Sequence, residues 1–82
     1  MPTIERIDGW RVVVYPNDHR PAHVHVIGAG CEAVFELDCP HGPPRLRESW
    51  GFSLKDINRV EKFLRKAVKS LCIAWEQIHG NL

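Results

Sequence analysis

The sequence predicts an α+β domain in which an antiparallel sheet of three strands, with room for a fourth, packs on one long C-terminal amphipathic helix. Residues 10–38 contain three runs rich in β-branched or alternating apolar residues, separated by turn-forming residues. Residues 52–79 instead repeat apolar residues at the spacing of one helical face, without an internal proline or glycine. The 82 residues leave room for a single domain, residues 1–82.

The three expected strands follow one another closely. Residues 10–15 are almost entirely β-branched or aromatic, and the strong turn formers at 16–18 end this first strand. Residues 23–27 form the second strand, 28–30 the turn, and 31–38 the third strand. Two strands joined by a short loop that contains glycine form an antiparallel hairpin.

The turn length sets the pairing of these two strands. A loop over residues 28–31 keeps the valines of the second strand facing the core, and a loop shorter by one residue would break this register. The pairs expected on this condition are Ile27 with Glu32, His25 with Val34 and His23 with Glu36.

The C-terminal helix follows an irregular connection at residues 39–51, in which a short fourth strand around 45–50 also fits the sequence. Ser53 can cap the helix N-terminus, Asp56 lies in the first turn, where negative charge is favourable, and Gly80 supplies the stop. The predicted apolar positions are Leu54, Ile57, Val60, Phe63, Leu64, Val68, Leu71, Cys72, Trp75 and Ile78.

This helix is expected to pack on the apolar face of the sheet, with Leu64 and Trp75 in the core. One continuous helix is preferred, and a kink near Ala67 is the alternative. The face that it should cover consists of Val24, Val26, Phe35 and Leu37.

Cysteine usage and hydropathy indicate a cytoplasmic protein. Three cysteines at positions 31, 39 and 72 form no spaced framework, and an odd count argues against a disulfide scaffold, so a reducing compartment is expected. The first residues lack the pattern of a signal peptide, and no apolar run approaches the roughly 20 residues that a membrane span needs.

The candidate site is the segment of residues 17–26, which contains three of the five histidines. Alternation along a strand directs His23 and His25 to the same face, opposite the core, with His19 and Arg20 on the preceding turn. The third strand adds Glu32 and Glu36 to that face. Three interpretations stay open: acid–base or substrate-binding groups, ligands of a divalent metal, or polar pairs that stabilise the hairpin.

A structural metal site is not expected. Cys39 and His41 could complete a zinc site with the two strand histidines, but their spacing matches no standard structural-zinc pattern. The sequence therefore predicts no tight structural metal site and no cofactor.

A basic stripe runs along the expected helix. At about 100° per residue its members lie on one line, nearly opposite the apolar face. Such a stripe could bind a phosphate backbone, or it could be an ordinary solvated face, since the net charge is only +1. The stripe consists of Lys55, Arg59, Lys62, Lys66 and Lys69.

Several segments together resemble the bacterial family known as domain of unknown function 4160. They are the start MPTI, the core DHxPxHVHV at residues 18–26, EAVFxL at 32–37, GFS at 51–53, and a helix ending WExxxG at 75–80. Many relatives have two prolines where this chain has Pro21-Ala22. The resemblance implies a small prokaryotic protein, often encoded beside another small protein and suspected to belong to a toxin–antitoxin pair. The residues that match the family core are His19, Pro21, His23 and His25.

These observations lead to a functional expectation with two alternatives. The first is a toxin-like or regulatory component that works with a small protein encoded by a neighbouring gene and acts on RNA, with His19, His23, His25 and Arg20 as candidate catalytic groups. The alternatives are a non-catalytic protein-binding module and a small metal-binding protein. Whether the chain is an enzyme, and whether it forms a homodimer, stays open at this point.

Overall fold

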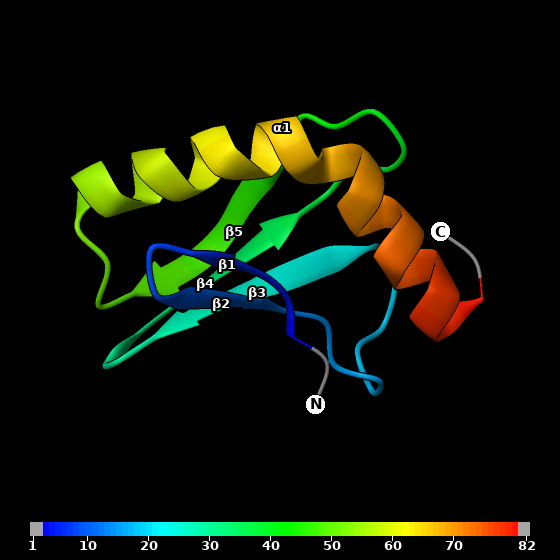
Figure 1. The fold of residues 1–82 in the computed structure, drawn as a ribbon, viewed down its shortest axis with the longest axis horizontal. Helices are drawn as coiled ribbons and strands as arrows, with labels where there is room; N and C mark the ends of the chain where they lie inside the picture. Colours follow the sequence, from blue (N-terminus) through cyan, green and yellow to red (C-terminus); the bar gives the residue numbers. More distant parts are fainter. Residues whose placement is uncertain (1–2, 81–82) are drawn as a thin grey trace.

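The computed structural model describes residues 3–80 and contains one five-stranded sheet and one helix (Figure 1). The strands lie in the sheet in chain order, and every neighbouring pair is antiparallel. The α+β class and the long C-terminal helix are confirmed, but the sheet has five strands and not three or four. The described residues contain no helix long and apolar enough to cross a membrane.

The strand that the sequence did not predict is β1 (Thr3–Ile7), which pairs with β2 (Trp10–Val13). The two are joined by Asp8 and Gly9, both with positive φ, at 50° and 91°. An Asp-Gly dipeptide with positive φ at both positions is the preferred two-residue hairpin turn. This dipeptide was the signal for β1, although only a short run of residues precedes it.

The hairpin of β3 (His23–Gly28) and β4 (Cys31–Glu36) has the expected register. All three predicted pairs are confirmed, although Gly28 also pairs with Cys31, so the connection itself is shorter than expected. The fourth strand is confirmed as β5 (Arg45–Trp50), which pairs with β4 at the edge of the sheet.

Helix α1 (Leu54–His79) covers one face of this sheet. The Ser53 side chain accepts a hydrogen bond from the backbone of Asp56, and Gly80, in the left-handed conformation, donates its N–H to the Glu76 carbonyl, so both predicted helix ends are confirmed. The core joins the predicted sheet face to the helix, and Leu64 and Trp75 are fully buried in it.

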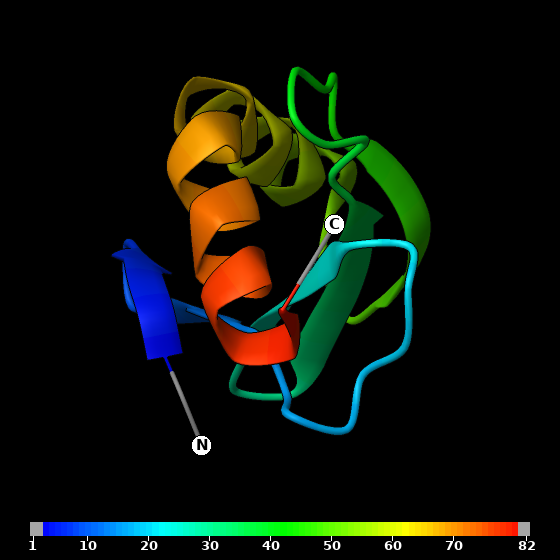
Figure 2. The ribbon, with the colours of Figure 1, turned by 90° about the vertical axis from the view of Figure 1, so that its right-hand side faces the viewer.

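The helix is continuous but changes direction in its middle, so that its C-terminal part descends over the end of the sheet where β3 begins (Figures 1 and 2). The Ser70 hydroxyl, near the middle of the helix, donates to the Ala67 carbonyl, 3.0 Å away. Serine hydroxyls bonded back to the preceding turn favour helix bending. The bend brings Trp75 to the beginning of β3.

The expectation of no disulfide was wrong, because the structure joins Cys39 to Cys72 and leaves Cys31 as a buried free thiol. The bonded cysteines are 33 residues apart, one in the connection after β4 and the other on the buried face of α1. The odd count therefore excluded a framework but not a single bridge. Of the start that matches the family, Met1 and Pro2 lie outside the described residues.

Candidate functional site: a histidine–carboxylate centre

His23 and His25 leave the same face of β3, as alternation predicted, but they do not face solvent. The side chain of His23 is 6% exposed and that of His25 is 15% exposed. The bent end of α1 explains the burial of His23, because the imidazole of His23 lies against the Trp75 indole of that helix. The ring centroids are 5.3 Å apart. The Tyr15 ring packs edge-on against His25 at 4.8 Å. The two histidines therefore line a partly enclosed site.

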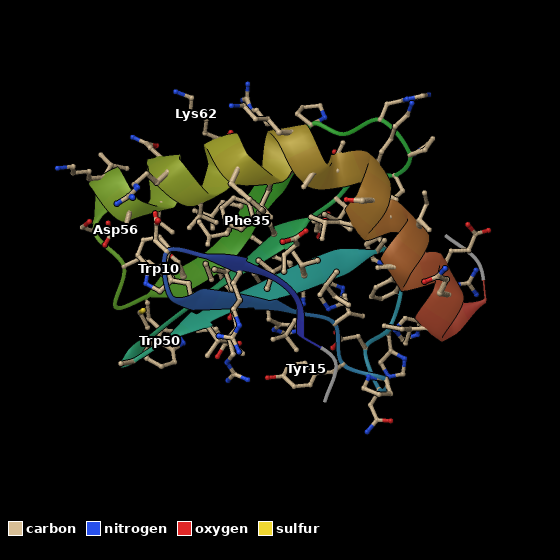
Figure 3. All side chains as sticks on the ribbon, viewed as in Figure 1. Trp10, Tyr15, Phe35, Trp50, Asp56 and Lys62 are labelled. Atoms are coloured by element: carbon tan, nitrogen blue, oxygen red, sulfur yellow. A yellow bond between two sulfur atoms is a disulfide. The ribbon has the colours of Figure 1, made fainter. Side chains whose placement is uncertain are left out.

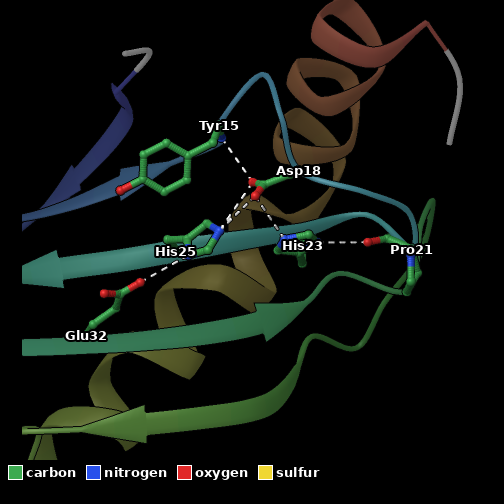
Figure 4. A network of polar contacts seen from close by, with 6 residues as sticks. All are labelled: Tyr15, Asp18, Pro21, His23, His25 and Glu32. Carbon is green, nitrogen blue, oxygen red and sulfur yellow. Dashed lines mark hydrogen bonds and ion pairs between the residues drawn. The ribbon is translucent and has the colours of Figure 1, made fainter.

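Asp18 supplies the carboxylate of this site, and its own turn holds it there (Figure 4). Its backbone N–H donates to the Tyr15 carbonyl at 3.0 Å, and one carboxylate oxygen, Oδ2, accepts from the Tyr15 N–H at 3.0 Å. Aspartate commonly stabilises a turn by bonding to the backbone in this way. The carboxylate is 13% exposed and points at both histidines.

His25 is held between two carboxylates. Its Nδ1 lies 3.1 Å from Glu32 Oε2, and its Nε2 lies 3.2 Å from each oxygen of Asp18. Glu32 lies opposite Ile27, the next residue along β3 on the same side, so it reaches His25 diagonally across the hairpin. The predicted role of Glu32 as a partner of the histidines is thus consistent with its position.

His23 is oriented by the backbone. Its Nδ1 lies 2.9 Å from the Pro21 carbonyl oxygen, and because a carbonyl only accepts, Nδ1 carries the proton of this bond. Its Nε2 then points to Asp18, at 3.5 Å from Oδ1. The rings of the two histidines pack edge to face, 5.2 Å apart.

As a result, three atoms that could serve as ligands lie close together. They are one oxygen of Asp18 and one ring nitrogen each of His23 and His25. None lies more than 4.8 Å from another. We call these three residues, with Glu32, the histidine–carboxylate centre. Such a group can hold a shared proton, bind a cation, or orient an imidazole for proton transfer.

The other predicted site residues lie outside this centre. His19 and Arg20 are exposed on the turn beside it, and no hydrogen bond or ion pair links them to the centre within residues 3–80. Glu36 lies opposite His23 as expected but bonds to Arg45 at 2.9 Å. A hydrogen bond from Arg45 to Asp38, together with the negative charges of Asp38 and Glu36, raises the pKa of Arg45.

All five residues of the basic stripe are exposed on α1. Arg59 is paired with Asp8, and Arg6 of β1 joins the stripe across a shallow groove of about 340 Å³. Lys62 and Tyr15 lie at opposite sides of the molecule in Figure 3. The stripe and the histidine–carboxylate centre therefore belong to different surfaces.

Asp18 lies inside the predicted candidate segment but was assigned no role there, and Tyr15 was missed altogether. The signal for Asp18 was present, since it follows Pro16 and Asn17 in a turn that starts the histidine segment. A turn aspartate near two strand histidines is typical of a ligand or an orienting group. Tyr15 had no such signal, because its contact with His25 arises only when the chain folds back.

The fold and this centre define a small α+β domain with a partly buried cluster of histidines and carboxylates. Residues 9–76 match the model of the family described as domain of unknown function 4160 (DUF4160), and the chain belongs to that family. No curated protein and no solved structure matched the chain.

Proposed function

We propose that this protein is one component of a toxin–antitoxin-like pair, encoded beside the gene of a second small protein, and that it acts on RNA through the histidine–carboxylate centre. The observation that carries the proposal is the held geometry of His25, with a carboxylate on each ring nitrogen. Polar clusters of this kind in partly buried positions are concentrated at functional sites. The two-gene context is what the family resemblance of the sequence implies.

Burial restricts how RNA would meet this centre. A nucleotide cannot touch His23 while its side chain is 6% exposed, so His23 acts as a positioning residue. Contact must come through Asp18, His25 and the exposed turn at residues 16–20. Arg20 on this turn offers a cation for a phosphate, which cleavage of a phosphodiester requires.

Expression in a bacterial host tests this proposal. The chain is expressed alone and together with the neighbouring gene, and growth and the integrity of total RNA are followed. We expect the chain alone to slow growth and His25→Gln to restore it, since glutamine has a similar size but cannot replace a ring held at both nitrogens. His41→Gln is the matched control, because His41 is exposed in the connection after β4.

Two outcomes would count against RNA action. One is slowed growth that persists in the His25→Gln variant at equal protein level. The other is growth inhibition with intact RNA, which would direct attention to a protein target.

The second candidate function is a non-catalytic protein-binding module, which the edge strand β5 favours. All six of its residues are exposed, and they include the apolar side chains of Leu46, 45% exposed, and Trp50, 59% exposed. An exposed edge strand offers unpaired backbone groups to a strand of a partner. Binding of the neighbouring gene product that is weakened by Trp50→Ala but not by Ile73→Ala, on the exposed side of α1, would support this function.

A further inference from the structure

We propose that Asp18, His23 and His25 together bind one divalent transition-metal ion, with zinc as the principal candidate. The ligand atoms are the Nε2 atoms of the two histidines and one carboxylate oxygen of Asp18. This inference goes beyond the proposed function, because ion binding does not require any action on RNA.

The first argument is the direction of the lone pairs. His23 donates from Nδ1 to the Pro21 carbonyl, so in the neutral ring its Nε2 carries a lone pair. That lone pair faces Asp18 Oδ1 at 3.5 Å, and a carboxylate only accepts. Two acceptors that face each other in a partly buried site need a proton or a cation between them.

A neutral His25 ring also faces more hydrogen-bond acceptors than it has N–H groups. A neutral imidazole has one N–H, yet carboxylates lie at hydrogen-bond distance from both of its ring nitrogens. If Nδ1 donates to Glu32, then Nε2 also directs a lone pair at Asp18. With this tautomer of His25, two nitrogen lone pairs and a carboxylate oxygen surround one point.

The negative charges of the centre also favour a bound cation. Within residues 3–80 neither Asp18 nor Glu32 forms an ion pair with a lysine or an arginine, whereas Glu36 and Asp38 both pair with Arg45. The Asp18 carboxylate is only 13% exposed, and charges that are largely removed from water are normally paired or bound to a metal. Protonation of both imidazoles would also balance the centre, but it would place a second positive charge on a ring that is 6% exposed.

The surroundings of the ligands match those of metal sites. A histidine that binds a metal usually donates its other ring N–H to a carboxylate or a backbone carbonyl, which fixes the tautomer and the ring orientation. Here the Glu32 carboxylate lies at Nδ1 of His25, and the Pro21 carbonyl lies at Nδ1 of His23. The Asp18 carboxylate is held in place by the backbone of Tyr15. All three ligands are therefore positioned before an ion arrives.

The spacing requires a small contraction. Zinc binds imidazole nitrogen at about 2.0–2.1 Å, so two nitrogens on one tetrahedral ion lie about 3.4 Å apart. No two of the three ligand atoms lie more than 4.8 Å apart. The distances from the Asp18 carboxylate to Nε2 of His25 and to Nε2 of His23 are shorter, at 3.2 and 3.5 Å. Small side-chain rotations of the histidines close this difference.

The ligand set selects the class of ion. Two imidazoles and one carboxylate suit zinc, iron(II), cobalt and nickel, whereas magnesium and calcium prefer oxygen ligands alone. Three protein ligands leave a position open for water or for a phosphate oxygen, as in catalytic rather than structural sites. The sequence-based prediction concerned a structural site with four ligands, which this centre is not.

Titration of tag-free, dialysed protein tests the site. Zinc chloride is added in a calorimeter, and cobalt chloride is followed by its visible absorption, with magnesium chloride as the negative control. We expect one zinc or cobalt per chain and no response to magnesium. Asp18→Asn and His25→Gln should abolish stoichiometric binding, and Glu32→Gln should weaken it by about 10–100-fold, since it removes only an orienting partner.

The matched control is His41→Gln, which alters an exposed histidine outside the site and should leave binding unchanged. Circular dichroism of each variant separates loss of the ion from loss of the fold. If Asp18→Asn unfolds, Glu32→Gln and His25→Gln decide the question on their own.

Several results would overturn the inference. They are the absence of zinc binding by the folded wild-type chain, full affinity in folded Asp18→Asn or His25→Gln, and a cobalt spectrum with a thiolate charge-transfer band, which would place the ion on Cys31. The titrations contain no RNA, so they test the metal site separately from the proposed function. Zinc binding by a chain that has no activity on RNA would contradict only the proposed function. RNA activity without binding would contradict only the metal site.

Discussion

The imidazole of His23 and the indole of Trp75 lie in contact, with ring centroids 5.3 Å apart, and this contact joins the histidine–carboxylate centre to the hydrophobic core. Trp75 is fully buried and also stacks on His79 at 3.9 Å. The end of α1 therefore covers one side of the centre. Substitutions that alter the packing of α1 should consequently change the geometry of the histidine–carboxylate centre.

The two strand histidines should differ in their effect on stability. His23→Gln removes a buried ring and its contact with Trp75, so we expect thermal unfolding at a clearly lower temperature. His25→Gln should unfold closer to wild type, because His25 is more exposed and glutamine retains hydrogen-bonding capacity. Parallel melting curves by circular dichroism measure this difference. Equal losses in both variants would mean that the whole centre acts as a structural network.

The core position of Leu64 predicts a large cost for its truncation. Leu64 is fully buried under α1, and Leu→Ala in such a position lowers the free energy of unfolding by about 2–5 kcal/mol. That loss is a large part of the stability of a small domain. Urea denaturation measures it, with Ile73→Ala, an exposed position on the same helix, as the control. An unchanged midpoint for Leu64→Ala would contradict the packing of α1 described above.

Gly51 and Gly30 provide a matched pair, since both have positive φ, at 79° and 71°. A Cβ atom at Gly51 would lie 2.1 Å from the Gly30 carbonyl oxygen, whereas one at Gly30 would meet nothing within 4 Å. Gly30→Ala therefore carries only the backbone strain of about 1–2 kcal/mol. Gly51→Ala adds a backbone clash and should destabilise the domain considerably more in urea denaturation. Similar costs would mean that the connection between β5 and α1 relaxes freely.

The basic stripe should contribute only modestly to RNA binding, because it lies on a different surface from the histidine–carboxylate centre. The double variant of Lys62→Gln and Lys66→Gln removes at most two phosphate contacts. The slope of log affinity against log salt for single-stranded RNA should then change by at most about 1.4. Fluorescence anisotropy at several salt concentrations measures the slope, with Arg47→Gln on β5 as the control. Complete loss of binding would make the stripe the principal RNA surface.

Local pattern was sufficient for most of the fold. Period-two alternation and turn residues predicted β2, β3 and β4 and the register of the β3–β4 hairpin, since a pleated strand with one buried face tolerates no slip. Ser53, Gly80 and the apolar spacing between them predicted α1, because caps and helical periodicity are properties of neighbouring residues. β1 was missed although Asp8-Gly9 marked its turn.

Only the tertiary structure decided the composition and the accessibility of the site. The sequence by itself determined that His23 and His25 share one face of a strand, because side chains alternate along any strand. It did not determine that α1 bends over His23, that Asp18 folds back onto both rings, or that Cys39 meets Cys72. Each of these contacts depends on the path of the chain between elements, which local preferences leave open, and burial follows from that path.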